Sequence, residues 1–165
     1  MRIFIGIKLD NKTTKIINNY YKYLYSENIT GNYTDSNNLH LTLAFLGEID
    51  QNTLENVITI TNSLENKITT ITLSKITKLK DMLVFEVAKD DKLLALQKEL
   101  ALKLENINIY KSKEFYPHVT LIRKVSDTTK INIVDKEVNI CSSCDNITVF
   151  QSTHINGKLK YIPCN

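Results

Sequence analysis

Two short stretches determine what the sequence predicts about the fold and the site: His40-Leu41-Thr42-Leu43 and His118-Val119-Thr120-Leu121. Both run histidine, apolar residue, threonine, leucine, and together they use two of the three histidines in 165 residues. Threonine fills 17 of 165 positions. A threonine two places after both histidines is therefore roughly a one-in-a-hundred coincidence. The repetition indicates a matched pair of functional groups.

Each tetrad predicts a strand with one apolar and one polar face. Side chains two positions apart point to the same side of a β-strand. His40 therefore projects with Thr42, and His118 projects with Thr120, while the apolar residues between them point to the opposite side. Two such strands facing one cleft would bring two imidazoles and two hydroxyl groups together.

The remainder of the chain alternates between strand and helix patterns, recognised by apolar residues at spacings of two or of three to four. Strands are expected over residues 2–8, 39–46 (ending at Gly47), 68–78, 82–88 and 118–123, and near 134–140, 145–155 and 159–163. Helices are expected over about 11–26 after Asp10, from Asp50 or Gln51, and after Asp90 or Asp91, with residues 27–38 as a loop. This order, with one tetrad in each half, suggests one folding unit made of two related halves.

Composition limits the class of protein. A hydrophobic content of 42% is sufficient for one compact domain over residues 1–165, and the net charge of +3 is compatible with an anionic ligand. No segment approaches the roughly 20 apolar residues needed to cross a bilayer, and the N-terminal strand is too short for a signal peptide. The odd number of cysteines, three, argues against a secreted disulfide framework. We therefore expect a cytoplasmic protein with no membrane partner.

The paired histidines suit phosphodiester cleavage without a metal ion. Imidazole titrates near neutrality, so one ring can take a proton from water while the other gives a proton to the departing sugar oxygen. The hydroxyls of Thr42 and Thr120 can donate to phosphate oxygens as charge develops there. Arg123 or Lys124 can add a cation to the same phosphate. A lone histidine on such a strand is usually structural, and the doubled motif is what favours the catalytic interpretation.

The segments around both tetrads resemble the 2H phosphoesterase superfamily, which is named for two His-x-Thr-x motifs. Within it, the RNA 2′,3′-cyclic phosphodiesterases, also called 2′-5′ RNA ligases, are the most similar group. Asn38–Gly47 resembles the first motif with its Phe-Leu-Gly tail, and Tyr116–Arg123 resembles the second with its preceding proline. Arg2–Ile7 is similar to the family's first strand. Looser matches fall in the C-terminal segment, at Ser152, Gly157 and Tyr161.

The resemblance implies a bilobal α+β fold, in which two antiparallel β-sheets flank a central cleft and helices pack outside. It implies that 2′,3′-cyclic phosphate ends of RNA, or cyclic nucleotides, are opened to 2′-phosphates. His40 would be the proton donor to the leaving 3′ oxygen and His118 the proton acceptor from water, with Thr42, Thr120 and Arg123 holding the phosphate. No cofactor or metal is implied, and we expect a monomer. An ATP-independent 2′-5′ ligation is implied as a reversible side activity.

Two other functions fit the same residues. A phosphodiesterase of 2′-5′ oligoadenylates, or of other small cyclic phosphates, would use the same histidine pair. A non-catalytic RNA- or nucleotide-binding protein would keep the cleft without turnover, although binding alone does not need two titrating groups. Few aromatic or basic residues mark a path for a long RNA. Phe45 and Tyr116 are expected to be core or wall residues rather than platforms for a base.

Two further features favour structural interpretations. Cys141 and Cys144 form a Cys-x-x-Cys half-site of the kind that binds zinc, but the spacing to His154 and Cys164 matches no common zinc module. We expect ordinary cysteines there. His154 has Asn156 rather than threonine two positions later, so we expect it not to be catalytic.

Overall fold

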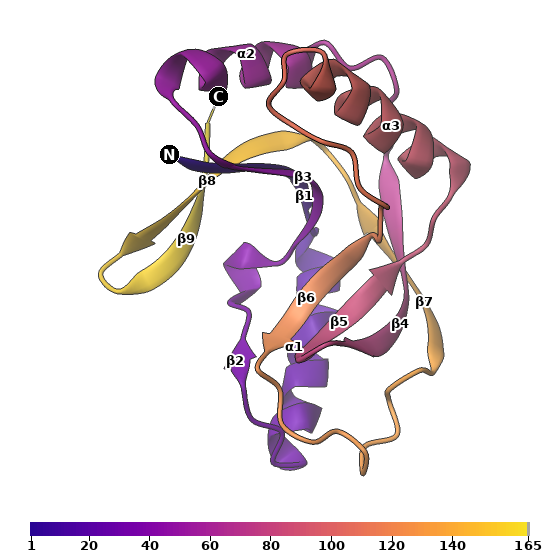
Figure 1. Ribbon diagram of the computed structural model, residues 1–165. Helices are drawn as coiled ribbons and strands as arrows, with labels where there is room; N and C mark the ends of the chain where they lie inside the picture. Colours follow the sequence, from indigo (N-terminus) through magenta and orange to yellow (C-terminus); the bar gives the residue numbers. More distant parts are fainter. Residues whose placement is uncertain (165) are drawn as a thin grey trace.

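Three α-helices and nine strands make up residues 1–164, the part of the chain that the computed structural model describes (Figure 1). The helices are α1 (Asn11–Ser26), α2 (Gln51–Asn62) and α3 (Asp91–Glu105). The strands are β1 (Arg2–Lys8), β2 (Asn32–Tyr33), β3 (His40–Glu48), β4 (Thr70–Leu79), β5 (Met82–Val87), β6 (His118–Arg123), β7 (Glu137–Ser143), β8 (Thr148–Ile155) and β9 (Lys158–Pro163). The predicted α+β class is confirmed. No helix in residues 1–164 is long and apolar enough to span a membrane.

The strands form one curled sheet in the order β7-β4-β5-β6-β3-β1-β8-β9, with β2 paired to β6. All of these strand pairs are antiparallel. The resemblance implied two antiparallel sheets flanking a cleft, and in the structure the strands of both are joined into one curled sheet through the pairing of β3 with β6. That ladder consists of a single residue pair, Leu41 with Val119. The halves are linked because the two motif strands lie side by side, and their backbones meet only at this point.

Each helix begins at an aspartate, as the sequence predicted. The carboxylates of Asp10, Asp50 and Asp90 accept hydrogen bonds from backbone N–H groups three residues later, at 2.7, 2.8 and 2.7 Å. Such N-caps satisfy donors that have no partner within the helix, and each stabilises its helix by about 1 kcal/mol. The helix starts are therefore encoded locally.

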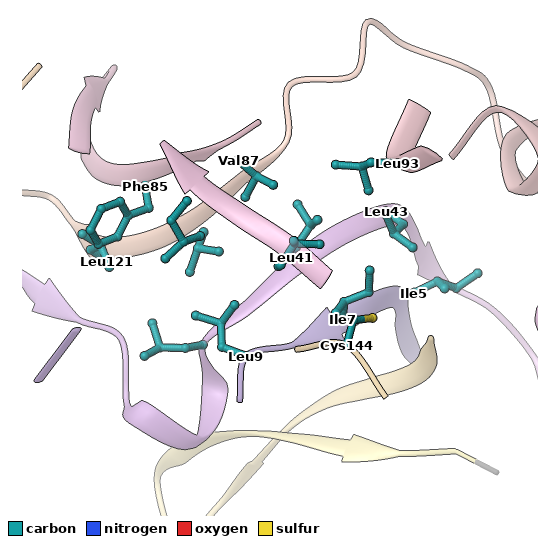
Figure 2. Packing of buried hydrophobic residues seen from close by; sticks show 14 of the residues in the cluster. Ile5, Ile7, Leu9, Leu41, Leu43, Phe85, Val87, Leu93, Leu121 and Cys144 are labelled. Carbon is teal, nitrogen blue, oxygen red and sulfur yellow. The ribbon is translucent and has the colours of Figure 1, made fainter. Parts of the chain in front are cut away.

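The core lies on one face of the sheet, between the strands and the helices (Figure 2). The alternating residues Ile3, Ile5 and Ile7 of β1 are fully buried, as are Leu41 of β3 and Val119 of β6. The helices contribute the buried residues Ile17, Leu24, Leu54, Val57, Leu93, Leu96, Leu100 and Leu104. Because the apolar face of the motif strands is used for packing, their polar face remains available for a site.

Several boundaries differ from the sequence-based expectation by up to three residues, and two of the differences bear on the motif strands. Strand β3 continues through Gly47, which adopts a positive φ of 72° at an irregularity in the pairing with β1. Glycine accommodates this conformation at low cost, so the strand is not ended there. The predicted loop over residues 27–38 contains β2, because β6 extends beyond its single pair with β3 and leaves an edge free for pairing.

Candidate active site

The pairing of β3 with β6 brings the two motifs together. Leu41 and Val119 pair in an antiparallel ladder and are both fully buried. In such a ladder the residues flanking a pair on one strand lie opposite those flanking it on the other. Each motif histidine therefore lies across from the threonine of the other motif. All four side chains project to the face opposite the core.

A β-bulge follows the threonine of the first motif. Gly6 pairs with Thr42 and Ile5 pairs with Ala44, which leaves Leu43 as an extra residue on β3. Leu43 and Ala44 are both buried, and Phe45 returns to the polar face with 49% of its surface exposed.

The second motif carries a bulge at the same place. Val84 pairs with Thr120 and Leu83 pairs with Ile122, which leaves Leu121 as the extra residue on β6. Strict alternation would place Arg123 with Leu121 on the core side. The bulge instead turns Arg123 to the face of the histidines, and Arg123 lines the same pocket as His40.

The two histidines are held by the same hydrogen bond. His40 Nδ1 lies 2.6 Å from the Asn38 carbonyl oxygen, and His118 Nδ1 lies 2.7 Å from the Tyr116 carbonyl oxygen. A carbonyl can only accept, so each Nδ1 carries the proton and each Nε2 is left for chemistry. His40 Nε2 lies 3.0 Å from Thr42 Oγ1.

The surroundings of His40 favour its neutral form. Burial lowers the pKa of His40 to about 4, and electrostatic repulsion from neighbouring basic groups, chiefly Arg123, acts in the same direction. The Asn38 carbonyl opposes this effect in part. His40 is therefore neutral at pH 7 when nothing anionic is bound, and a bound phosphate would shift its pKa upward.

A pocket of about 440 Å³ opens beside His40, large enough for a nucleotide-sized ligand. Its lining combines the predicted site residues His40, Thr42 and Arg123 with Arg2, Phe4, Phe45, Ser152, His154, Leu159 and Tyr161. His118 and Thr120 do not line this pocket and lie next to it on β6. The structure therefore places the five predicted residues on two adjacent strands, with three of them in the pocket wall.

Several residues of this wall were not predicted as site residues. Phe4 and Tyr161 pack against the His40 ring, with ring centroids 4.7 and 4.9 Å away. The Arg2 guanidinium lies 5.0 Å from the centroid of the Phe45 ring. Arg2 and Phe4 could have been found from the sequence, because they alternate with the buried isoleucines of β1. Tyr161 reaches the site only because β9 folds back on β8, which no local pattern reveals.

Of the other residues considered in the sequence analysis, some lie outside this pocket, and for others the expected role stays a prediction. His154 lines the pocket wall, and its predicted lack of a catalytic role stays a prediction. Tyr116 is outside this pocket and donates a hydrogen bond to the Glu86 carboxylate. Cys141 is exposed, whereas Cys144 is buried and burial raises its pKa to about 11. Within residues 1–164 no three histidine, cysteine, aspartate or glutamate side chains gather as a metal site would require.

Comparisons with known proteins agree with this geometry. A family model described as LigT like Phosphoesterase matches residues 7–82, which include the first motif. An RNA 2′,3′-cyclic phosphodiesterase of Methanocaldococcus jannaschii is 26% identical over 125 residues, covering 74% of this chain and 71% of that protein. Both matches are to phosphoesterases.

Solved structures share the whole fold. E. coli LigT complexed with NADP+ superposes with a TM-score of 0.83 at 22% identity, covering 99% of this chain and 94% of that one. The protein TT0787 of Thermus thermophilus gives a TM-score of 0.82 at 18% identity, covering 100% of this chain and 96% of that one. The same E. coli protein complexed with 3′-AMP gives 0.81 at 22% identity, with coverage of 99% and 94%. In sequence over residues 7–82 and in overall fold, the chain is therefore similar to LigT-like phosphoesterases.

Proposed function

We propose that the protein hydrolyses 2′,3′-cyclic phosphate ends of RNA, or cyclic nucleotides, to 2′-phosphates without a metal ion. The observation that carries this proposal is the cross-strand array, in which both imidazoles are held through Nδ1 by a backbone carbonyl and lie on the same sheet face. Neither Nε2 is bound to the backbone, and that of His40 lies 3.0 Å from Thr42 Oγ1. The relative from M. jannaschii is named for this reaction, and E. coli LigT has been seen in complex with 3′-AMP. Both support a nucleotide phosphate as ligand.

In the proposed reaction a water oxygen attacks phosphorus, and the bond from phosphorus to the 3′ oxygen breaks. His118 Nε2 accepts the proton of the attacking water, and His40 Nε2 donates a proton to the departing 3′ oxygen. The products are a 2′-phosphate and a free 3′ hydroxyl. General acid–base catalysis of this kind contributes about 10²–10⁴-fold per group.

His40 must be protonated to act as the donor, although its pKa is about 4 in the unliganded protein. The negative charge of the bound phosphate supplies the required shift, because an anion beside an imidazole stabilises its protonated form. The enzyme would thus take up the catalytic proton when the substrate binds.

Thr42, Thr120 and Arg123 act on the phosphate in this proposal. The two hydroxyls donate hydrogen bonds to non-bridging oxygens, and the guanidinium neutralises the charge that develops there. Arg123 reaches this position through the bulge at Leu121. The same proposal includes a cytoplasmic monomer that needs no cofactor, with 2′-5′ ligation as a reversible side reaction.

The test is a comparison of substrates with the product identified. We expect turnover of a 2′,3′-cyclic nucleotide to the 2′-phosphate, separated from the 3′-phosphate by chromatography. If only a 2′-5′-linked oligoadenylate is turned over, the protein is instead a phosphodiesterase of 2′-5′ oligoadenylates. Tight nucleotide binding without any turnover would favour the non-catalytic binding protein.

A further inference from the structure

A second pocket, of about 340 Å³, adjoins the first between β2 and the β8–β9 hairpin. The two pockets share Arg123, Leu159 and Tyr161 in their linings. A ligand in the first pocket can therefore continue into the second past the Arg123 side chain.

The second pocket is positively charged. Lys158 and Lys160 of β9 line it together with Arg123, and none of the three forms an ion pair within residues 1–164. The one carboxylate in the lining is that of Asp35, which accepts a hydrogen bond from the Asn37 backbone N–H at 2.9 Å. Three cations against one engaged carboxylate favour an anionic ligand.

The pocket also offers uncharged donors. Asn32 and Thr34 line it. Thr34 Oγ1 is the single buried side-chain oxygen or nitrogen in residues 1–164 that has no hydrogen-bond partner. Cations combined with amide and hydroxyl groups are typical of contacts to nucleic-acid phosphates.

Asn38 connects this pocket to the candidate active site through two hydrogen bonds. Its backbone oxygen accepts the hydrogen bond from His40 Nδ1 at 2.6 Å, and its side chain donates to the Leu159 carbonyl at 2.9 Å. Strand β9, with its two lysines, is thus held at a fixed place relative to His40.

We propose that the second pocket binds the phosphodiester on the 5′ side of the nucleotide whose cyclic phosphate is opened. This inference rests on the proposed function and narrows it, because the preferred substrate becomes the end of an RNA strand rather than a free cyclic nucleotide. Lys158 and Lys160 are far from both motifs in the sequence. Only the folding of β9 onto β8 makes them part of a path for RNA.

The first test compares a 2′,3′-cyclic mononucleotide with a tetranucleotide that ends in the same cyclic nucleotide. In the variant Lys158→Gln/Lys160→Gln, the ratio of kcat/KM for the tetranucleotide to that for the mononucleotide should fall about 10-fold, as expected for two partly exposed cation–phosphate contacts. Lys92→Gln/Lys98→Gln removes the same charge from exposed positions on α3 and should keep the wild-type ratio. An unchanged ratio in the β9 variant would overturn the proposal.

The second test does not need turnover. Binding of the tetranucleotide with a 2′-phosphate end is followed by fluorescence anisotropy as salt is varied. The second pocket holds one phosphodiester in this proposal, so loss of that contact to a single strand should reduce the slope of log K against log salt by about 0.7 in the β9 variant. Equal slopes for wild type and variant would overturn the proposal that the second pocket binds a phosphodiester. Failure of wild type to hydrolyse either substrate would instead overturn the proposed function.

Discussion

His40 and His118 make the same hydrogen bond to a backbone carbonyl but have different surroundings. The His40 ring packs against Phe4 and Tyr161, and its burial lowers its pKa to about 4. The His-x-Thr spacing in the sequence predicted that both residues belong to the site. The difference between them depends on residues of β1 and β9, so local spacing does not reveal it.

The proposed role of His40 can be tested by its titration. We expect the His40 imidazole to titrate near pH 4 in the free protein. A bound nucleoside 2′-phosphate should raise this pKa by at least about one unit, because the anion stabilises the protonated ring. NMR titration of the His40 resonance, with and without the ligand, measures both values. No upward shift in the complex would contradict the role of His40 as proton donor.

The low pKa of His40 also has a consequence for stability. The unfolded chain binds a proton at this residue below about pH 6.5, whereas the folded chain does so only below about pH 4. The free energy of unfolding should therefore increase as pH rises from about 4 to 6.5, by up to about 3 kcal/mol from this residue.

Urea unfolding at pH 4.5 and pH 7 measures that dependence. The variant His40→Gln should lose part of the difference between the two pH values. His154→Gln, at an exposed position, serves as the control and should keep the wild-type difference. Identical pH dependence in His40→Gln and wild type would show that the pKa of His40 is not depressed in the folded state.

At the level of elements, helix starts and strand positions followed from local patterns. Aspartate caps and apolar residues at helical spacing predicted α1, α2 and α3, because their determinants lie within a few residues. The bulges at Leu43 and Leu121 were not predicted, because each depends on the pairing of β3 or β6 with a neighbouring strand. In the sequence, each bulge corresponds to two consecutive apolar residues followed by one residue whose side chain returns to the polar face.

The close approach of β1 to β3 at the first bulge gives a prediction for Gly6. A Cβ atom on Gly6 would lie 2.6 Å from the Leu41 carbonyl oxygen, which is too close for any side chain. Gly6→Ala should therefore lower the free energy of unfolding by about 1–3 kcal/mol and displace His40, whose ring also borders this glycine.

Urea unfolding and kcat are measured for Gly6→Ala beside Gly157→Asn. Gly157 has a positive φ of 74°, and a Cβ atom added to it would meet no other atom within 4 Å. Asparagine tolerates such a φ, so the control should change little. Wild-type stability in Gly6→Ala would mean that the two strands do not approach this closely.

Across the whole molecule, the site depends on residues that are distant in sequence. β3 and β6 meet at one residue pair, and each of these two strands carries a bulge directly after its motif threonine. The division into one domain with two pseudo-symmetric lobes stays a prediction. The sequence predicted the motif residues because their pattern is local. It did not predict the pocket wall from β1, β8 and β9, because that wall is created by sheet topology.

The central claim is that His40 and His118 together open a cyclic phosphate. Its most direct test is hydrolysis, in EDTA, of a short RNA ending in a 2′,3′-cyclic phosphate by wild type, His40→Ala, His118→Ala and His154→Ala. The account predicts metal-independent formation of a 2′-phosphate end by wild type, near-normal activity in His154→Ala, and a loss of at least about 10² in rate in each of the other two variants. Full activity in His40→Ala or His118→Ala, or a requirement for added divalent metal ions, would contradict it.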